Sequence, residues 1–439
     1  MAQTTPELDH RHLWHPFTQQ RDWGAEEPLV IERAEGTDLI DAEGRHYIDG
    51  VSSLWCNVHG HRHPLIDEAI AGQLDRVAHS TMLGLTHPGA AELAARLVEL
   101  APPGLERVFY SESGSTAVEI ALKMAFQYWH QGEGSDRRHT SYVCLEGAYH
   151  GDTIGSVSVG GIDLFHGAYG PLLFDCHRVA PGDSAGLARL LDSHAGEIAA
   201  VIVEPLVQGA AGILVQPPGF LRRARELTEA HDVLLIADEV ATGFGRTGTM
   251  FACEQERVAP DLLCLGKGLT GGYLPLAATL ATERIHEGFL GAHEEFRTFF
   301  HGHTFTGNPL ACAAALGNLA AFEREATLLR LQPKIRLLGE LLGEVAELPE
   351  VAEVRGRGFM VGIDLGEHDP ALRLGHRVTL EARERGAVVR PLGDTIVLMP
   401  PLAIAKADLR RLVAIVAESI EAAHTSLRGA PAAELRAAA

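Results

Sequence analysis

Positive charge, long apolar runs and an export signal are scarce or missing in this chain. Its 37 Lys and Arg residues face 58 Asp and Glu residues, which gives a formal net charge of −21. So acidic a chain is a poor partner for nucleic acid or for an anionic membrane surface. No apolar run reaches the length of a membrane-spanning helix, and the N-terminus lacks the basic-then-apolar order of a signal peptide. We therefore predict a cytoplasmic protein that binds neither nucleic acid nor membrane.

Cysteine pairs and metal-binding motifs are missing as well. The six cysteines are scattered without a C-x-x-C pair, which predicts reduced and mostly packed thiols. Among the 23 histidines, the clusters HGHRH at residues 59–63 and HGH at residues 301–303 suggest a metal. Neither cluster forms an H-E-x-x-H motif or combines with cysteine at zinc spacing. Glycine-rich turns with polar edges explain them more simply, and we predict no metal site.

Lysine is rare, and one of the four lysines stands apart from the others. Lys123, Lys334 and Lys406 lie in amphipathic, helix-like stretches, whereas Lys267 lies between two glycines after the apolar run at residues 262–265. A buried lysine is suited to imine formation, because desolvation lowers its pKa and frees the nitrogen lone pair. A surface lysine that follows a strand is the simpler interpretation of this pattern taken alone.

A second apolar run favours the chemical interpretation of Lys267. Residues 233–237 have the length and β-branched content of a buried strand, and Asp238 and Glu239 follow directly. In open α/β sheets, ligands bind outside the carboxyl ends of the strands, so Asp238 and Lys267 should point into one crevice. A buried aspartate there can pair with a pyridinium nitrogen. The glycines of GFGRTG (243–248) also fit G-x-G-x-x-G, but acids precede them, so we predict no dinucleotide site.

These two stretches carry a resemblance to a known family. DEVATGFGRTG (238–248) and LGKGLTGGYLPLAA (265–278) resemble the signature of the class III aminotransferases, and the resemblance extends from about residue 11 to about residue 420. It implies an α/β fold, the pyridoxal-phosphate (PLP)-dependent transferase fold type I, with PLP as cofactor. This fold has a large domain with a central, mostly parallel sheet and a smaller α+β domain built from both termini. We expect residues 1–65 and 330–439 in the small domain and residues 66–329 in the large one.

The resemblance also implies roles for individual residues around the cofactor. Lys267 would hold PLP as an imine and move the proton, Asp238 would pair with the pyridine nitrogen, and Tyr149 would stack on the ring as a third catalytic residue. Gly114 and Ser115 would hold the phosphate. From the residues alone, this turn fits a helix N-terminal anion site and an ordinary helix cap equally well. Gln208 would donate to the phenolic oxygen of the cofactor.

A further implied feature is a homodimer whose active site is shared across the interface. In the family, the segment at residues 299–309 (FFHGHTFTGNP) reaches the PLP phosphate of the partner. This implies cofactor contacts for His303 and Thr304 and a substrate contact for Gly302. A capped helix entry explains the same residues equally well from sequence alone.

Longer phrases resemble the branch of the family that transfers an amine to 8-amino-7-oxononanoate in biotin synthesis. The resemblance assigns Arg390 to the substrate carboxylate and places Phe17, Leu54, Trp55 and Tyr149 along the substrate. The phrases are HPFTQQ, DGVSSLWCNVHGH, LKMAFQYW, YHGDT, QGAAG, HGHTFTGNP and VVRPLGD.

Two positions bear on the amino donor. Members of this branch that use S-adenosylmethionine typically have a tyrosine where this chain has Phe17 and a tryptophan where it has Leu54. The chain therefore resembles more closely the members that take the amine from L-lysine. Other readings remain open: a class III enzyme for ornithine, 4-aminobutyrate or another ω-amino acid, a racemase or aminomutase, or a non-catalytic binding protein. We expect residues 1–10 to be mobile and the chain from about residue 429 to be frayed.

Overall fold

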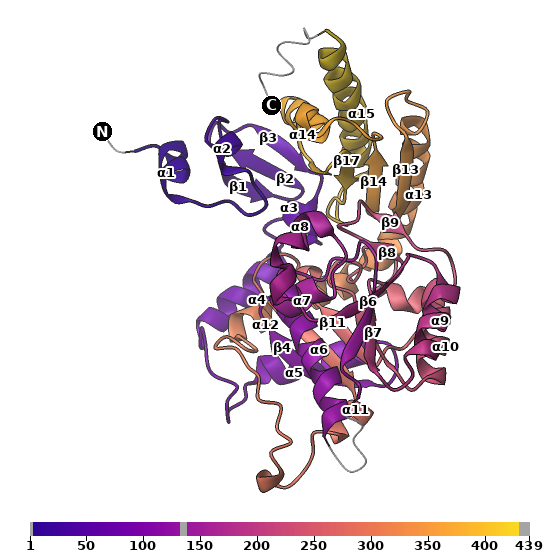
Figure 1. Ribbon diagram of the computed structural model, residues 1–439. Helices are drawn as coiled ribbons and strands as arrows, with labels where there is room; N and C mark the ends of the chain where they lie inside the picture. Colours follow the sequence, from indigo (N-terminus) through magenta and orange to yellow (C-terminus); the bar gives the residue numbers. More distant parts are fainter. Residues whose placement is uncertain (1–2, 132–137, 430–439) are drawn as a thin grey trace.

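The computed structural model describes residues 3–131 and 138–429 of the chain, and Figure 1 shows them as two lobes. The lower lobe contains a seven-stranded sheet with the order β4-β12-β11-β10-β7-β5-β6. Its strands are β4 (Leu105–Ser111), β5 (Ser141–Leu145), β6 (Cys176–Val179), β7 (Ile198–Val203), β10 (Leu234–Asp238), β11 (Leu262–Leu265) and β12 (Ala277–Thr282).

The sheet is mostly parallel, as predicted. Strands β6, β5, β7, β10 and β11 pair in parallel, whereas β12 runs antiparallel to both β11 and β4. The predicted strand at residues 233–237 is β10, and all five residues of β10 are buried. Leu235 and Ala237 pack into one hydrophobic core, and Leu234 and Ile236 pack into another on the opposite face. Burial on both faces explains why the strand is a continuous apolar run.

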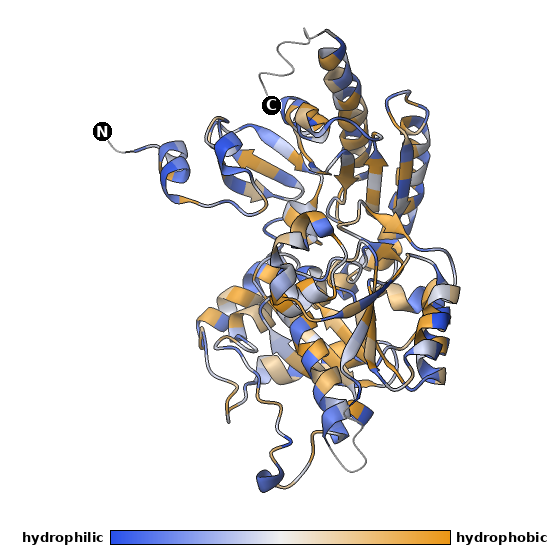
Figure 2. Cartoon of the chain, in the orientation of Figure 1, coloured by the Kyte–Doolittle hydropathy of each residue, from blue (hydrophilic) through white to orange (hydrophobic). Residues whose placement is uncertain are grey.

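Helices cover both faces of this sheet. Helix α6 (Gly114–His130) packs against β11 and β12, while α10 (Phe220–Ala230) packs against β10. In Figure 2 the strands of the sheet are mostly coloured as hydrophobic, whereas α9 (Ser184–Ser193) and α10 carry hydrophilic residues on the outside. In the described residues, no helix combines the length and the apolar character that crossing a membrane requires. The other helices of this lobe are α4 (Pro64–Leu74), α5 (Pro88–Leu100), α7 (Ile154–Ser158), α8 (Asp163–His166), α11 (Glu283–Glu287) and α12 (Pro309–Arg324).

The upper lobe is built from both ends of the chain, which confirms the predicted smaller α+β domain. Strands β1 (Ile31–Glu35), β2 (Asp38–Asp41) and β3 (His46–Asp49) form a sheet with β15 (Ala387–Val388), and β15 pairs in parallel with β3. A second sheet has the order β13-β14-β17-β16. The domain boundaries at residues 65 and 330 stay a prediction.

The remaining elements complete the upper lobe and the connection between the lobes. They are α2 (Gln20–Trp23), α3 (Ser52–Trp55), β8 (Val207–Gln208), β9 (Leu214–Val215), α13 (Thr327–Val345), β13 (Glu353–Arg357), β14 (Met360–Asp364), α14 (Leu374–Glu384), β16 (Arg390–Leu392), β17 (Thr395–Leu398) and α15 (Lys406–Gly429).

The N-terminal residues, which we expected to be mobile, include a helix. Helix α1 (Thr5–His12) begins with a capping box: Glu7 N donates to Thr4 Oγ1 at 3.4 Å, and Thr4 N donates to a Glu7 carboxylate oxygen at 2.8 Å. The sequence T-T-P-E carries this signal, because Thr, then Pro in the first turn, then Glu is a helix start. The expected fraying beyond residue 429 lies outside the described residues.

Candidate active site

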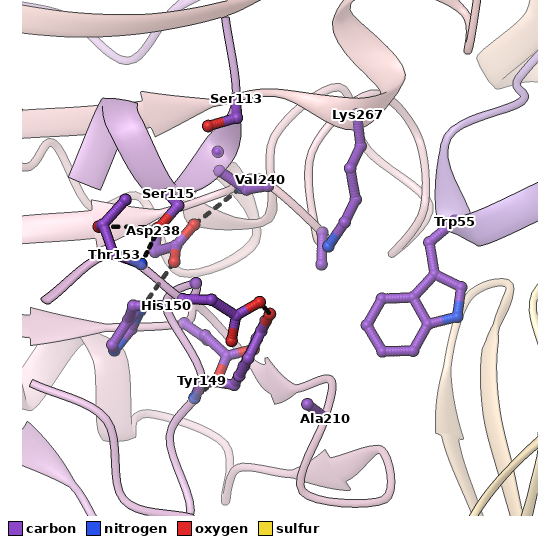
Figure 3. Close-up of a pocket in the computed structure, with 15 residues that line it drawn as sticks. Trp55, Ser113, Ser115, Tyr149, His150, Thr153, Ala210, Asp238, Val240 and Lys267 are labelled. Atoms are coloured by element: carbon purple, nitrogen blue, oxygen red, sulfur yellow. Dashed lines mark hydrogen bonds and ion pairs between the residues drawn. The ribbon is translucent and has the colours of Figure 1, made fainter. Parts of the chain in front are cut away.

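A cavity of about 460 Å³ lies at the carboxyl ends of β10 and β11. Figure 3 shows the Lys267 side chain between Trp55 on one side and Asp238 with His150 on the other. The predicted residues Trp55, Gly114, Ser115, Tyr149, Asp238 and Lys267 all line this cavity. The other lining residues are Ser113, His150, Gly151, Asp152, Thr153, Glu204, Ala210, Val240 and Ala241.

Lys267 is held with its amine in the cavity by the turn that follows β11. Its backbone is in the left-handed region, with φ of 40°, and the Nζ atom lies 4.8 Å from the centroid of the Trp55 ring. Burial lowers the pKa of Lys267, although the charges of Asp238 and Glu204 act in the opposite direction. A lowered pKa favours the neutral amine, which is the nucleophilic form.

Asp238, the last residue of β10, is held from two sides. Its Oδ1 accepts a hydrogen bond from Val240 N at 3.0 Å, and its Oδ2 lies 2.7 Å from His150 Nδ1. Burial lowers the pKa of His150, but the hydrogen bond and charge of Asp238 outweigh burial, so the pKa is raised above 6.5. The sequence analysis did not single out His150, because nothing local shows that it contacts Asp238.

The turn before α6 lies at the cavity wall, and it contains the helix cap that the sequence predicted as one of two alternatives. Ser113 caps the helix by accepting from Thr116 N, and Gly114 and Ser115 form the first turn. A Cβ atom on Gly114 would come within 2.5 Å of Val240, so no larger residue fits beside this wall without displacing it. Unpaired backbone N–H groups at a helix N-terminus attract anions such as phosphate.

Tyr149 and Glu204 form the floor of the cavity. The Tyr149 hydroxyl donates to Asp152 at 2.7 Å, and burial raises the pKa of Tyr149 above its ordinary value. Glu204 accepts hydrogen bonds from Tyr149 N at 3.1 Å and from Gly209 N at 2.8 Å. Burial raises the pKa of Glu204 to about 7. Glu204 therefore fixes the loop that carries Tyr149.

A neighbouring pocket of about 400 Å³ contains Phe17 and Arg390. Arg390 follows β15 and is the first residue of β16. Burial lowers the pKa of Arg390, and in the described part of the chain its guanidinium has no hydrogen-bond or ion-pair partner. The Phe165 ring lies 5.3 Å from that of Phe17 and 6.4 Å from that of Tyr149. Phe165, which the sequence did not single out, therefore lies next to one lining residue of each pocket.

Five predicted residues lie outside the lining of both pockets. The Gln208 side chain donates to Glu146 O at 2.9 Å, and its carbonyl accepts from Gln216 at 2.7 Å. Leu54 is 48% exposed. Gly302, His303 and Thr304 line neither pocket, and His303 Nδ1 lies 3.3 Å from a carboxylate oxygen of Glu112, the residue before Ser113. The predicted contacts of these five residues with cofactor or substrate stay predictions.

The histidine clusters do not gather into a metal site within residues 3–131 and 138–429, where no group of three or more His, Cys, Asp or Glu residues could hold an ion. In HGHRH, His59 is buried and His61 contacts Asp49. The six cysteines are free thiols.

The fold, with a buried lysine and a buried aspartate facing one cavity, defines a site of the PLP-dependent type, and comparison with known proteins identifies the family. The chain belongs to the family described as aminotransferase class-III, which matches residues 20–420. It is 59% identical to the adenosylmethionine-8-amino-7-oxononanoate aminotransferase of Nitratidesulfovibrio vulgaris over 94% of this chain and 81% of that protein. The enzyme of that name from Geobacter sulfurreducens is 51% identical, over 98% of this chain and 99% of that protein.

A solved structure of the same name is also similar. The enzyme from Methanocaldococcus jannaschii superposes with a TM-score of 0.93 and 44% identity, covering 95% of this chain and 98% of that one. An amine transaminase from an uncultivated Pseudomonas species, solved in its PLP-bound form, gives a TM-score of 0.88 and 38% identity over 94% and 99% of the two chains.

Proposed function

We propose that this chain transfers an amino group to 8-amino-7-oxononanoate and forms 7,8-diaminononanoate, with PLP held at Lys267. The names of the similar enzymes support this acceptor. The structural observation that carries the proposal is the unpaired guanidinium of Arg390 in the pocket beside the Lys267 cavity. An unpaired, half-buried arginine suits a carboxylate, and the acceptor carries its carboxylate at the end of the chain remote from the reacting ketone.

The residues around the cavity fit PLP in charge and shape. Lys267 offers a buried amine with a lowered pKa, and Asp238 offers a carboxylate that two donors hold in place. The first turn of α6 would hold the phosphate, because Gly114 leaves the wall free of side chain there. Tyr149 offers an aromatic ring at the floor. When bound, PLP withdraws electrons from the carbon next to the amine nitrogen.

The protein side chains transfer the proton, orient the cofactor and exclude water. Lys267 Nζ, once released, takes the proton from the donor carbon and later delivers a proton to the acceptor carbon, as general base and then acid. Asp238 would pair with the ring nitrogen of the cofactor and keep that nitrogen protonated. His150 orients Asp238 through the hydrogen bond of 2.7 Å. Trp55 covers Lys267 and keeps water from the amine.

The function is tested by mass spectrometry of 7,8-diaminononanoate after incubation of the purified enzyme with PLP, the oxo acid and each donor. Product formation supports the proposal. Ornithine and 4-aminobutyrate are supplied in parallel as donors, with 2-oxoglutarate as the acceptor. Faster turnover with either of these pairs, and no diamine, would favour the alternative ω-amino acid aminotransferase.

L-Lysine is the donor that we propose over S-adenosylmethionine. Phe17 lines the pocket next to Arg390 and has no hydroxyl that could hydrogen-bond to S-adenosylmethionine. Leu54 provides no second indole ring that could face the sulfonium or the adenine of that donor. The donor is tested in half-reactions followed by the cofactor absorbance. Bleaching by L-lysine and not by S-adenosylmethionine supports the proposal, and the reverse result contradicts it.

We propose a homodimer in which Gly302, His303 and Thr304 reach the cofactor site of the partner subunit. Phe300 and Phe305, which flank these residues, are 72% and 54% exposed in the single chain. Apolar side chains this exposed suit an interface. Light scattering should give twice the mass of the chain. Thr304→Ala should weaken PLP binding, and a monomeric enzyme with full activity would contradict the proposal.

A further inference from the structure

The segment that carries Trp55 is strained, and this strain needs an explanation. Ser52, Ser53 and Trp55 have φ values of 52°, 62° and 64°, in the left-handed region that residues other than glycine rarely adopt. Such conformations cost free energy and persist where surrounding contacts impose them, often next to an active site. Here they turn the chain sharply after β3, and the turn ends with the indole of Trp55 against Lys267 Nζ.

The Asp49 side chain makes the contacts that impose this conformation. Its carboxylate is fully buried and accepts hydrogen bonds from Ser53 N at 2.8 Å and from Ser53 Oγ at 2.9 Å. A third contact joins Asp49 Oδ2 to His61 Nε2 at 3.1 Å. Charge-assisted hydrogen bonds to a buried carboxylate are strong, so this anion fixes Ser53 in the left-handed conformation.

The partners of His61 keep the Asp49 carboxylate in place. His61 Nδ1 lies 3.2 Å from Asn57 Nδ2, which has hydrogens to donate, so His61 Nδ1 accepts and Nε2 donates to Asp49. Asn57 Oδ1 in turn accepts from Gly60 N at 2.7 Å, which sets the orientation of its amide. The tautomer of His61 that donates to Asp49 is therefore fixed by Asn57.

The same segment is tied to the strand before Arg390. Gly50 N donates to Val388 O at 2.9 Å, and Ser52 Oγ donates to Met399 O at 2.6 Å. A Cβ atom at Gly50 would lie 2.9 Å from Val388 O, so only glycine allows this close approach. The turn therefore has a fixed base on the upper lobe, and Asp49 sets its direction toward the large sheet.

We propose that Asp49 is a positioning residue that acts on the reaction through Trp55. Asp49 holds Ser53 in its strained conformation, this conformation places the Trp55 ring over Lys267, and the ring keeps the amine out of water. Asp49 does not line the Lys267 cavity and touches neither Lys267 nor Tyr149. The inference rests on the proposed role of Lys267 but not on the identity of donor or acceptor.

A double-mutant cycle tests this proposal. Asp49→Asn presents an amide N–H₂ to donors, so at least one donor loses its acceptor, and kcat/KM should fall on the order of tenfold. In a Trp55→Ala background the same change should cost less than about twofold, because the ring through which Asp49 acts is already lost. A general structural role of Asp49 predicts the same cost in both backgrounds, and that result would overturn the proposal.

A rescue substitution at Ser53 is the second test of the proposal. Glycine adopts positive φ without strain, so Ser53→Gly should restore at least half of the activity that Asp49→Asn removes. Failure to restore it would count against the proposal. If Asp49→Asn does not fold, Ser53→Ala gives the same test with Asp49 intact, because alanine loses the Oγ contact with Asp49 and adds no volume to the Arg390 pocket, which Ser53 lines. Its cost should likewise disappear in the Trp55→Ala background, and a persistent cost would contradict the proposed route through Trp55.

Discussion

His150 Nδ1 lies 2.7 Å from Asp238 Oδ2, and both side chains are buried. The contact fixes one carboxylate oxygen of Asp238, while Val240 N holds the other at 3.0 Å. Asp238 is therefore a rigid anion at the end of β10, aimed into the cavity that Lys267 shares. Rigid charge of this kind needs no reorganisation during the reaction, which is the basis of electrostatic catalysis.

This geometry predicts unequal costs at the two residues. Asp238→Asn removes the charge that would pair with the cofactor, and kcat should fall on the order of a hundredfold or more. His150→Asn removes only the orienting contact, and kcat should fall on the order of tenfold. Steady-state kinetics with retained PLP absorbance checks both values. Equal loss at the two positions would show that His150 does more than orient Asp238.

The isolated guanidinium of Arg390 predicts a specific defect in acceptor binding. Arg390→Gln should raise the KM for the oxo acid on the order of a hundredfold, because a bidentate contact with a carboxylate is lost. Arg385→Gln is the matched control: Arg385 lies just after α14, in an ion pair with Glu381, and the change should leave KM unaltered. A KM that does not respond to Arg390→Gln would remove this residue from the substrate site.

The position of Arg390 also predicts which amine of L-lysine is transferred. Among the described residues, the lining of the Lys267 cavity includes Asp152, Glu204 and Asp238 but no arginine, so it is unsuited to a carboxylate next to the reacting carbon. With its carboxylate at Arg390, lysine presents its side-chain amine to the cavity. The carbon that carries this amine is one bond closer to the carboxyl carbon than the ketone carbon of the acceptor is. The ε-nitrogen label should therefore appear in the diamine, and 6-aminohexanoate should act as a donor. Transfer of the α-nitrogen, or donation by L-norleucine, would refute this orientation.

Buried His59 predicts a loss of stability in acid. Burial lowers the pKa of His59 from 6.5 to about 4. The folded state therefore binds fewer protons than the unfolded state between these values, and stability falls as the pH drops from 6.5 toward 4. The shift lowers the free energy of unfolding by roughly 3 kcal/mol across this window. Glu204 and Glu239, whose pKa values burial raises to about 7, act in the opposite direction.

A comparison with His59→Gln isolates this contribution, because the glutamates are common to both proteins. Urea unfolding at several pH values should show the difference between wild type and variant shrinking as the pH falls. A difference that does not depend on pH would mean that His59 can ionise in the folded protein.

The predictions from sequence succeeded where a single strand end determined the position of a side chain. Asp238 and Lys267 lie at the ends of apolar runs with the length of buried strands, and sheet geometry then predicted that the two side chains converge. His150 and Asp49 were missed because the roles proposed for them depend on contacts between distant segments, which local pattern does not encode. Helix α1 was missed for a different reason, since the capping residues Thr4 and Glu7 were visible but were not weighed.

The most direct test compares two lysine variants in the amination of 8-amino-7-oxononanoate. Lys406 lies exposed at the start of α15, whereas Lys267 lies in the cavity. With PLP and the preferred donor, Lys406→Ala should form 7,8-diaminononanoate at the rate of the wild type. Lys267→Ala should form no diamine and should lose the absorbance of the bound cofactor. Diamine formation by Lys267→Ala at a comparable rate would contradict the central claim that this amine carries the reaction.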